Sequence, residues 1–513
     1  MPVLEVLTHD DAEVFVLDAA LSRVARSVGG FRQRLRRGLY KIRVSRAGTL
    51  QEQLVELRGE DQQHRIFIDR FSAIAPIGPM LADAGGVERL AREAIDGLAG
   101  SGPGLLVLAR QGVGGPDPRR PFRGARIFPW RATRQAVRLD AGPVYTAAIG
   151  GELWAARAVE VNPGDGPLVL EFKHGQQLAR QSVLVAPDWQ TRIFLRANDD
   201  SRQAPRERVA HTGTAQFDVS IQMAPPGADV VYMDRSATVE VAKSALERGR
   251  AIFTSERLVE ELLYSKFDNP IAGITGLHLF LDAKARADAG DAEYRLARGA
   301  RRLRRNEQEI ADDVLINLTR LLDPARAAAA QRHEKSEAGL RRMLLDADPD
   351  WPESSDLTAL RLRAGRCRGQ VVVPSPPMFR VSWDVLKANA SRDGKVWIGR
   401  ELWSGTGAAG SAGPYLAWAR GRHSVKRTLE HIQSQSVAWP GSDGGLGWKQ
   451  DNAEAPGVVT ERFRSRKISY PFEHAAWDRD PGRQDESARE QARLAADFGL
   501  PLSILQKAPD KAR

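Results

Sequence analysis

Three glycines late in the chain have the spacing of a dinucleotide-binding loop. Gly405, Gly407 and Gly410 fit the pattern Gly-x-Gly-x-x-Gly, and residues 396–398 before them form a candidate strand. A nucleotide site needs a helix that begins at the third glycine, because the helix amide groups and dipole bind the pyrophosphate. Pro414 follows too closely to permit that helix, and no βαβ pattern surrounds the glycines. The spacing therefore predicts a flexible loop, and we expect no cofactor.

The sole cysteine is the next residue whose surroundings suggest reactivity. Cys367 lies between Arg366 and Arg368, and neighbouring cations lower the pKa of a thiol. A catalytic cysteine also needs a His base, and the nine histidines are scattered without such a pattern. We interpret Cys367 as incidental. With one cysteine, an internal disulfide and a zinc site built from cysteines are excluded.

The motifs of several common enzyme classes are absent. The chain has no phosphate-binding loop, no serine nucleophile elbow and no Cys-x-x-Cys pair. The dipeptide His333-Glu334 lacks the second His that zinc peptidases carry at helical spacing. We therefore expect no catalytic and no metal-binding residues, and a protein that is not an enzyme.

Two clusters of basic residues are the candidate interaction surface. The net charge of +10 favours an anionic partner such as nucleic acid. The chain is rich in Arg throughout, however, and no recognition helix, zinc finger or aromatic RNA-binding motif accompanies the clusters. We rank a solvated face first, docking of an acidic protein second and nucleic acid third. The clusters contain Arg34, Arg36, Arg37, Lys41, Arg43, Arg301 and Arg304.

The first part of the chain alternates in the manner of β-strands. Residues 38–44 place Tyr40, Ile42 and Val44 on one face and basic residues on the other, which is typical of a half-buried antiparallel strand. A similar strand and turn occupies residues 166–175, and a closing strand follows each turn at the same interval. This spacing predicts the same hairpin built twice, in two β-sandwich-like units.

From about residue 236 onward, the apolar residues recur at the spacing of an α-helix. Pro270 begins a helix through Leu281 that is apolar nearly all round and is predicted to be buried. Ala272, Gly273 and Gly276 allow close helix approach, so this segment is predicted to be a packing hinge more than a ligand site. Short helices without strands between them predict an irregular array resembling tetratricopeptide repeats. The predicted helices are 86–98, 239–250, 258–267, 270–281, 292–302, 307–322, 338–345, 355–363 and 381–390.

These elements predict an α+β multidomain protein. The expected divisions are a β-sandwich-like domain at 1–75, a second β-rich domain with one helix at 76–235, a helical array at 236–400, and a Gly-rich and polar tail, partly disordered, at 401–513. The acidic N-terminal residues do not form a signal peptide, and the longest apolar stretch is too short to span a bilayer. We expect a cytoplasmic protein without membrane insertion.

Two segments resemble known families. Residues 38–44 are similar to the closing strand of carboxypeptidase-regulatory-like β-sandwich domains. Residues 262–281, with Asn269 to Gly273, and residues 377–383 resemble uncharacterised bacterial accessory proteins associated with caspase-like peptidase systems. The second resemblance implies an adaptor beside a separate effector, and it transfers no catalytic residues.

The sequence therefore predicts a non-catalytic adaptor or scaffold that binds other proteins. The alternative is a basic nucleic-acid-binding protein, whose affinity would fall steeply with salt.

Overall fold

The chain has an α+β fold, seen in a computed structural model. The structure describes residues 1–47, 49–68, 73–77, 83–98, 104–112, 122, 124–130, 136–162, 166–174, 177–197, 217–231, 236–247, 261–290, 306–347, 353–367, 369, 371–373, 375–392, 396–398 and 414–419. Contacts divide the chain into two compact units. Unit 1 contains Met1–Leu168, Val183–Ala329 and Ser411–Tyr415, and unit 2 contains Val169–Ser182, Ala330–Gly410 and Leu416–Arg513.

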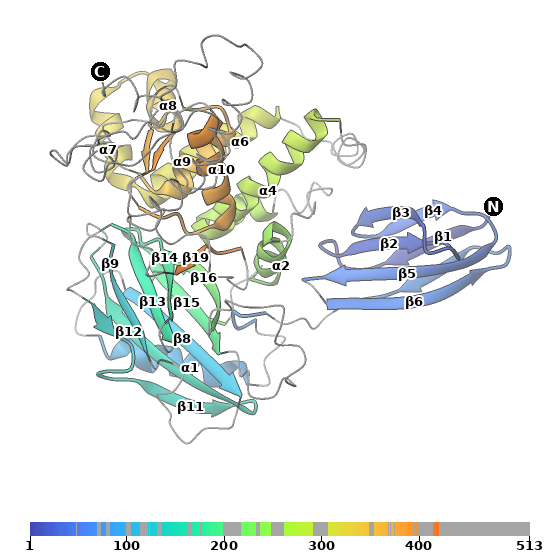
Figure 1. Cartoon of the computed structure of the whole chain (residues 1–513), viewed down its shortest axis with the longest axis horizontal. Coiled ribbons are helices and arrows are strands. Elements are labelled where there is room, and N and C mark those ends of the chain that lie inside the picture. Colours follow the sequence, from blue (N-terminus) through green and yellow to red (C-terminus); the bar gives the residue numbers. More distant parts are fainter. Residues whose placement is uncertain are drawn as a thin grey trace, which may run out of the picture. The chain divides into compact units, whose positions relative to one another are not determined.

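The first strands of unit 1 form two sheets around one apolar core (Figure 1). They are β1 (Val3–Leu7), β2 (Glu13–Leu17), β3 (Arg23–Val28), β4 (Phe31–Arg34), β5 (Gly38–Arg46), β6 (Thr49–Leu57) and β7 (Gln62–Arg65). One sheet has the order β3-β2-β5-β6 and the other β4-β1-β7. Ile42 and Val44 are fully buried between the sheets, as their alternation predicted, and Val14 of β2 is buried beside them. We call the sheet β3-β2-β5-β6 the N-terminal sheet.

A third sheet of unit 1, with five strands, packs against a helix. Its strands are β8 (Gly104–Gly112), β11 (Tyr145–Ile149), β12 (Glu152–Glu160), β15 (Gln190–Ala197) and β16 (Phe217–Ala224), in the order β11-β12-β8-β15-β16. Helix α1 (Ala84–Asp96) begins where the Asp83 side chain accepts the Gly86 N–H at 2.8 Å. Val87 and Leu90 of α1 pack with Trp154 in the apolar core. Unit 1 also contains the antiparallel pair β9 (Ala125–Pro129) and β10 (Val137–Arg138).

The helices of unit 1 include one whose first part is buried on all sides. They are α2 (Ser236–Glu247), the 3-10 turn η6 (Ser265–Phe267), α4 (Pro270–Asp288) and α6 (Glu307–Leu322). Every residue from Pro270 to Leu281 is buried, which confirms the prediction from its apolar composition. A Cβ atom on Gly273 would lie 2.6 Å from the Cβ of Lys266, so glycine permits the close approach of η6 and α4. The segment is thus the packing hinge that its small residues predicted.

Unit 2 combines short helices with short strands. β13 (Leu168–His174), β14 (Gln177–Val183) and β19 (Ala417–Ala419) are neighbours in one sheet, and β17 (Val371–Val373) pairs in parallel with β18 (Val396–Ile398). The later helices of the chain are α7 (Pro324–His333), α8 (Glu337–Leu345), α9 (Ser355–Arg363) and α10 (Arg380–Arg392). The Asp356 carboxylate of α9 accepts the backbone N–H groups of Met378 at 2.7 Å and Phe379 at 3.1 Å, next to the start of α10.

The sequence predicted most of these elements but not all of them. Helices α1, α2, α4, α6, α8, α9 and α10 overlap their predicted ranges, and the strands predicted near 38–44 and 166–175 are present as β5 and β13. The predicted hairpin partners were wrong, because β5 pairs with β6 and β13 with β14, whereas the predicted closing strand at 192–195 lies in β15 of another sheet. The expectation of no strands within the helical segment was wrong, because β17 and β18 lie there. β18 coincides with the candidate strand at residues 396–398, whereas β17 has three residues, which is too short to produce a periodic signal. Of the predicted tail, the structure describes 414–419, where Tyr415 is fully buried.

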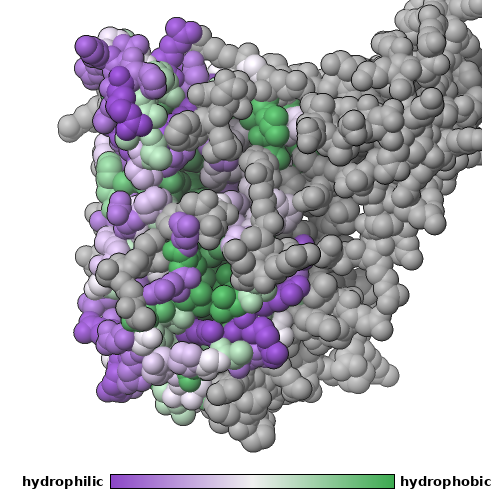
Figure 2. Space-filling model, turned by 90° about the vertical axis from the view of Figure 1, so that its left-hand side faces the viewer, coloured by the Kyte–Doolittle hydropathy of each residue, from purple (hydrophilic) through white to green (hydrophobic). Residues whose placement is uncertain are grey.

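The described surface mixes hydrophilic and hydrophobic residues. Figure 2 shows one face on which hydrophobic residues gather in a patch among hydrophilic ones. A mixed surface is ordinary, because a folded protein has too little polar surface to cover itself. Within the described residues, each helix is either too short or too polar to cross a bilayer.

Candidate protein-binding surface and a buried polar cluster

The outer face of the N-terminal sheet carries exposed leucines between charged residues. Leu39, Leu50 and Leu54 are 48%, 51% and 67% exposed. A sheet with one buried face normally presents polar residues on the other, so three exposed leucines on two adjacent strands are unusual. We call this set the outer leucine face, which consists of Leu39, Lys41, Arg43, Leu50, Glu52 and Leu54.

The charges of the outer leucine face are paired with each other. Arg43 lies directly opposite Glu52, with its Nε 2.7 Å from Oε1, and the Lys41 Nζ lies 2.5 Å from Oε2. Hydrogen bonds from Lys41 and then Arg43 hold the pKa of Glu52 below its ordinary value. Both basic residues therefore already have an anionic partner and are poorly placed to bind phosphate groups.

The same pattern continues across the sheet. Phe15 lies opposite Arg43 on β2, and the Arg26 guanidinium lies 5.4 Å from the centre of the Phe15 ring. Arg26 also contacts the Glu13 carboxylate at 2.6 Å. The outer face of the whole sheet thus alternates apolar groups with paired charges.

The structure places the predicted basic residues on more than one face. Arg34 lies on β4 in the three-stranded sheet, whereas Lys41 and Arg43 lie on the outer face of the N-terminal sheet. Arg36 and Arg37 are exposed in the turn before β5. Because the two sheets share one core, their outer faces point in opposite directions. Arg301 and Arg304 lie outside the described residues.

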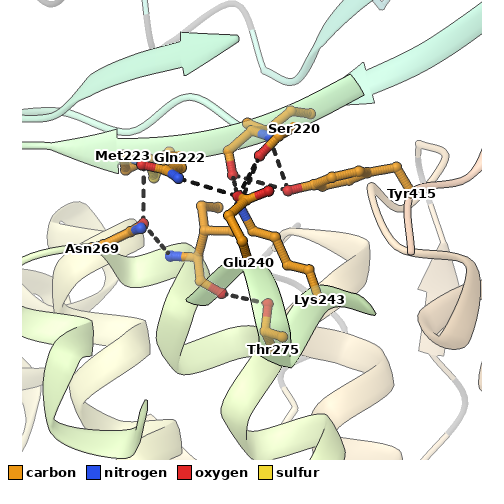
Figure 3. Close-up of polar contacts among 10 residues, drawn as sticks. Ser220, Gln222, Met223, Glu240, Lys243, Asn269, Thr275 and Tyr415 are labelled. Carbon is orange, nitrogen blue, oxygen red and sulfur yellow. Dashed lines mark hydrogen bonds and ion pairs between the residues drawn. The ribbon is translucent and has the colours of Figure 1, made fainter. Parts of the chain in front are cut away.

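A second group of functional side chains is buried in unit 1 (Figure 3). Lys243 of α2 places its Nζ 3.0 Å from the Ser220 Oγ, 3.0 Å from the Glu240 carboxylate and 2.9 Å from the Ile221 carbonyl oxygen. The Ser220 hydroxyl donates to Glu240 at 2.7 Å. Tyr415 completes the cluster, with its hydroxyl 2.9 Å from both the N–H and the carbonyl of Ile221.

A serine beside a lysine is the arrangement of a nucleophile and its base, but this pair does not meet the chemical requirements. Burial disfavours the charged amine, yet Glu240 and Tyr415 outweigh it, so the pKa of Lys243 is raised. A general base must be neutral, and a protonated Lys243 cannot accept the Ser220 proton. Ser220 and Lys243 are 1% and 2% exposed, which leaves no access for a substrate.

The buried cluster instead covers the edge of a sheet. β16 is an edge strand, and its outward backbone groups are bound by side chains. Tyr415 and Lys243 bind Ile221, and the Asn269 side chain accepts the Met223 N–H at 3.1 Å while it also caps α4 (Figure 3). We therefore interpret the cluster as edge protection.

Sequence reasoning missed both features for different reasons. Leu50, Glu52 and Leu54 alternate visibly, but the alternation alone does not distinguish a buried from an exposed leucine face. The cluster joins Ser220, Lys243 and Tyr415, which are far apart in the chain and match no motif.

Two other features named in the sequence are a cysteine and a glycine pattern. Cys367 is partly exposed, and the glycine pattern at 405–410 lies outside the described residues. In the described part of the chain, no three His, Cys, Asp or Glu side chains are grouped so that they could hold a metal ion. No protein-family model matches the chain, and the searches of curated proteins and of solved structures found no similar protein.

Proposed function

We propose that the protein is a non-catalytic adaptor that binds another protein through the outer leucine face. The exposure of Leu39, Leu50 and Leu54 between paired charges is the observation that carries this proposal. Apolar patches with polar surroundings are typical of protein–protein contacts, where a few buried apolar side chains supply most of the affinity.

Charge supports a protein partner over nucleic acid. Nucleic-acid binding depends on cations that replace condensed counterions along the phosphates. On the outer leucine face Lys41 and Arg43 share the Glu52 carboxylate, and the leucines offer nothing to phosphate. Three exposed arginines lie outside the outer leucine face: Arg34, Arg36 and Arg37. Nucleic-acid binding, the alternative function, would act through them.

The wider role follows from the resemblance of residues 262–281 and 377–383. We propose an accessory factor of a bacterial effector system, acting in the cytoplasm beside a separate effector. The N-terminal region would be a β-sandwich-like binding unit. The helices between Ser236 and Arg392 would form an irregular, TPR-like array with a second contact surface.

The test is a substitution on the outer leucine face, measured against a purified partner. The immobilised full chain captures proteins from lysate of its native host, and each captured protein is produced separately and titrated by calorimetry. Leu39→Asp is expected to weaken the binding at least tenfold, because an exposed apolar contact becomes a charge that binding must desolvate.

Leu21→Asp is the matched control. Leu21 is 67% exposed in the turn between β2 and β3, and Asp tolerates its positive φ of 59°. Binding unchanged in Leu21→Asp and lost in Leu39→Asp supports the outer leucine face. Equal binding by both variants would refute it.

A further inference from the structure

A row of arginines points outward from the three-stranded sheet β4-β1-β7. Phe31 at the start of β4 and Leu35 just after it are buried in the apolar core, so the alternate positions between and after them face outward. The Leu35 N–H donates to the Pro2 carbonyl at 3.0 Å, which continues the alternation past the end of β4. Each outward position is an exposed arginine. We call this set the arginine row, which consists of Arg32, Arg34 and Arg36.

The guanidinium groups of the arginine row are open to a partner. Glu5 lies opposite Arg32 on β1, but its carboxylate accepts the Gln63 side-chain N–H at 2.7 Å instead. The Asp61 carboxylate accepts the Val3 N–H at 2.8 Å. Within the described residues, none of the three guanidinium groups forms a hydrogen bond or an ion pair. The row therefore differs from the basic residues of the outer leucine face, which already share a carboxylate.

One further arginine lies on the same outer face. Arg65 of β7 lies beside Leu7 of β1 and is exposed. β1 separates β7 from β4, so Arg65 lies roughly 10 Å from the row, since neighbouring strands are about 4.8 Å apart. Arg65 thus adds to the positive potential of the face, whereas the regular spacing belongs to the row alone.

We propose that the arginine row binds an extended acidic segment of a partner protein. The proposal goes beyond the outer leucine face, which lies on the opposite side of the same core, and does not depend on it. A guanidinium binds a carboxylate through two parallel N–H···O bonds. Alternate residues of an extended segment lie about 6.4–6.8 Å apart, which is also the repeat of the row, so Asp or Glu at every second position meets one arginine each.

The carboxylates on this face favour a peptide over nucleic acid. A nucleic acid carries a phosphate at every nucleotide, so a strand laid across the sheet meets Glu5 and Asp61 as well as the arginines. Like charges that are brought together at an interface cost affinity. A peptide can place neutral residues beside the two carboxylates and acidic residues at the row. Three cations also fall short of the roughly 6–10 phosphate contacts that give a DNA-binding protein its strong dependence on salt.

The probe is a labelled nine-residue synthetic peptide of Ser with three Glu at every second position, titrated with the full chain by fluorescence anisotropy at about 50 mM salt. A control peptide of the same composition has its Glu at every third position, so successive carboxylates of an extended chain point to opposite sides. We expect saturable binding of the first peptide and at least fivefold weaker binding of the control. An alternating peptide that does not bind, or binds no better than the control, would overturn the proposal.

Two double variants locate the binding on the sheet. Arg32→Gln with Arg34→Gln removes two charges of the row and should weaken the alternating peptide at least fivefold. Arg58→Gln with Arg89→Gln removes the same charge from exposed arginines elsewhere in unit 1 and should leave the affinity unchanged. All four side chains are exposed, so both variants keep the apolar core intact. Equal losses in the two variants would show that the peptide follows net charge alone, which refutes the arginine row as the site.

A single-stranded RNA of nine nucleotides is the competing ligand. If the RNA binds more tightly than the alternating peptide at the same salt, and Arg32→Gln with Arg34→Gln weakens it, the row is a nucleic-acid site and the proposal is refuted. The partner found through the outer leucine face should bind this variant and the unchanged protein equally. Failure of the alternating peptide to bind therefore leaves the proposed function standing, and failure of Leu39→Asp to weaken that partner leaves the arginine row standing.

Discussion

Two buried lysines of unit 1 show how the neighbours of an amine determine its charge. Lys243 faces the Glu240 carboxylate, and its pKa is raised despite burial. Lys266 donates to the Leu263 carbonyl at 2.7 Å and lies 4.3 Å from the centre of the Phe267 ring. Burial lowers the pKa of Lys266 to about 8, because the Asp313 carboxylate offsets it only in part. One amine is thus fixed as a cation, and the other titrates near neutral pH.

Lys266 is expected to make stability depend on pH. The folded protein releases this proton near pH 8, whereas the unfolded chain holds it up to the ordinary pKa of 10.5, so unfolding takes up a proton in between. Stability should therefore rise from pH 8 to pH 10, by about 1–2 kcal/mol after allowance for solvent screening. Urea denaturation across this range measures the effect. In the Lys266→Met variant, the rise in stability between pH 8 and pH 10 should disappear. If the variant and the unchanged protein show the same rise, Lys266 is not its source.

Removal of the Lys243 charge should be strongly destabilising. Lys243→Met leaves the Glu240 carboxylate buried without its cation, which typically costs about 3–5 kcal/mol. The matched control is Lys284→Met, which removes an exposed pair with Asp288 and should cost less than about 1 kcal/mol. Thermal and urea denaturation of the full chain provide the comparison. Equal losses of stability in the two variants would show that the buried Lys243–Glu240 pair contributes no more to stability than the exposed pair.

At the scale of the element, close helix packing depends on one glycine of α4. Gly273→Ala places a methyl group against Lys266 and Leu318, so we expect a loss of about 1–3 kcal/mol from overpacking. Gly85→Ala in α1 meets only the Asp83 carboxylate at 3.7 Å and should gain about 0.5–1 kcal/mol from helix propensity. Denaturation midpoints that move in opposite directions confirm the difference, and a neutral Gly273→Ala would contradict it.

The individual helices and strands also show what the sequence could predict. The period of α4 and the alternation of β5 gave the right elements, because each places its apolar residues by local geometry. The tertiary contacts of those elements could not be predicted in the same way. Nothing local connects Tyr415 with Ile221, and nothing local distinguishes the exposed Leu54 from a core leucine. Periodicity reports which residues share a face, and the topology decides what that face meets.

For the whole molecule, the net charge of +10 makes a quantitative test of the alternative function possible. If the proposed function holds, a labelled DNA duplex should show no saturable binding at about 150 mM salt, and weak binding at low salt should vanish as salt is added. Fluorescence anisotropy over a salt series measures this. Saturable binding at the higher salt, lost when Arg34, Arg36 and Arg37 are changed to Glu, would instead establish a nucleic-acid-binding protein.

The contact between Tyr415 and Ile221 has a consequence for biosynthesis. The two residues are separated by 194 positions, so translation at about 5–20 residues per second leaves Ile221 without this partner for roughly 10–40 s after it is made. During that interval Lys243 and Asn269 alone cover the edge of β16, and the Ile221 N–H lacks its partner. A nascent chain stalled before Tyr415 should therefore bind chaperones. A chain that extends past Tyr415 should release them.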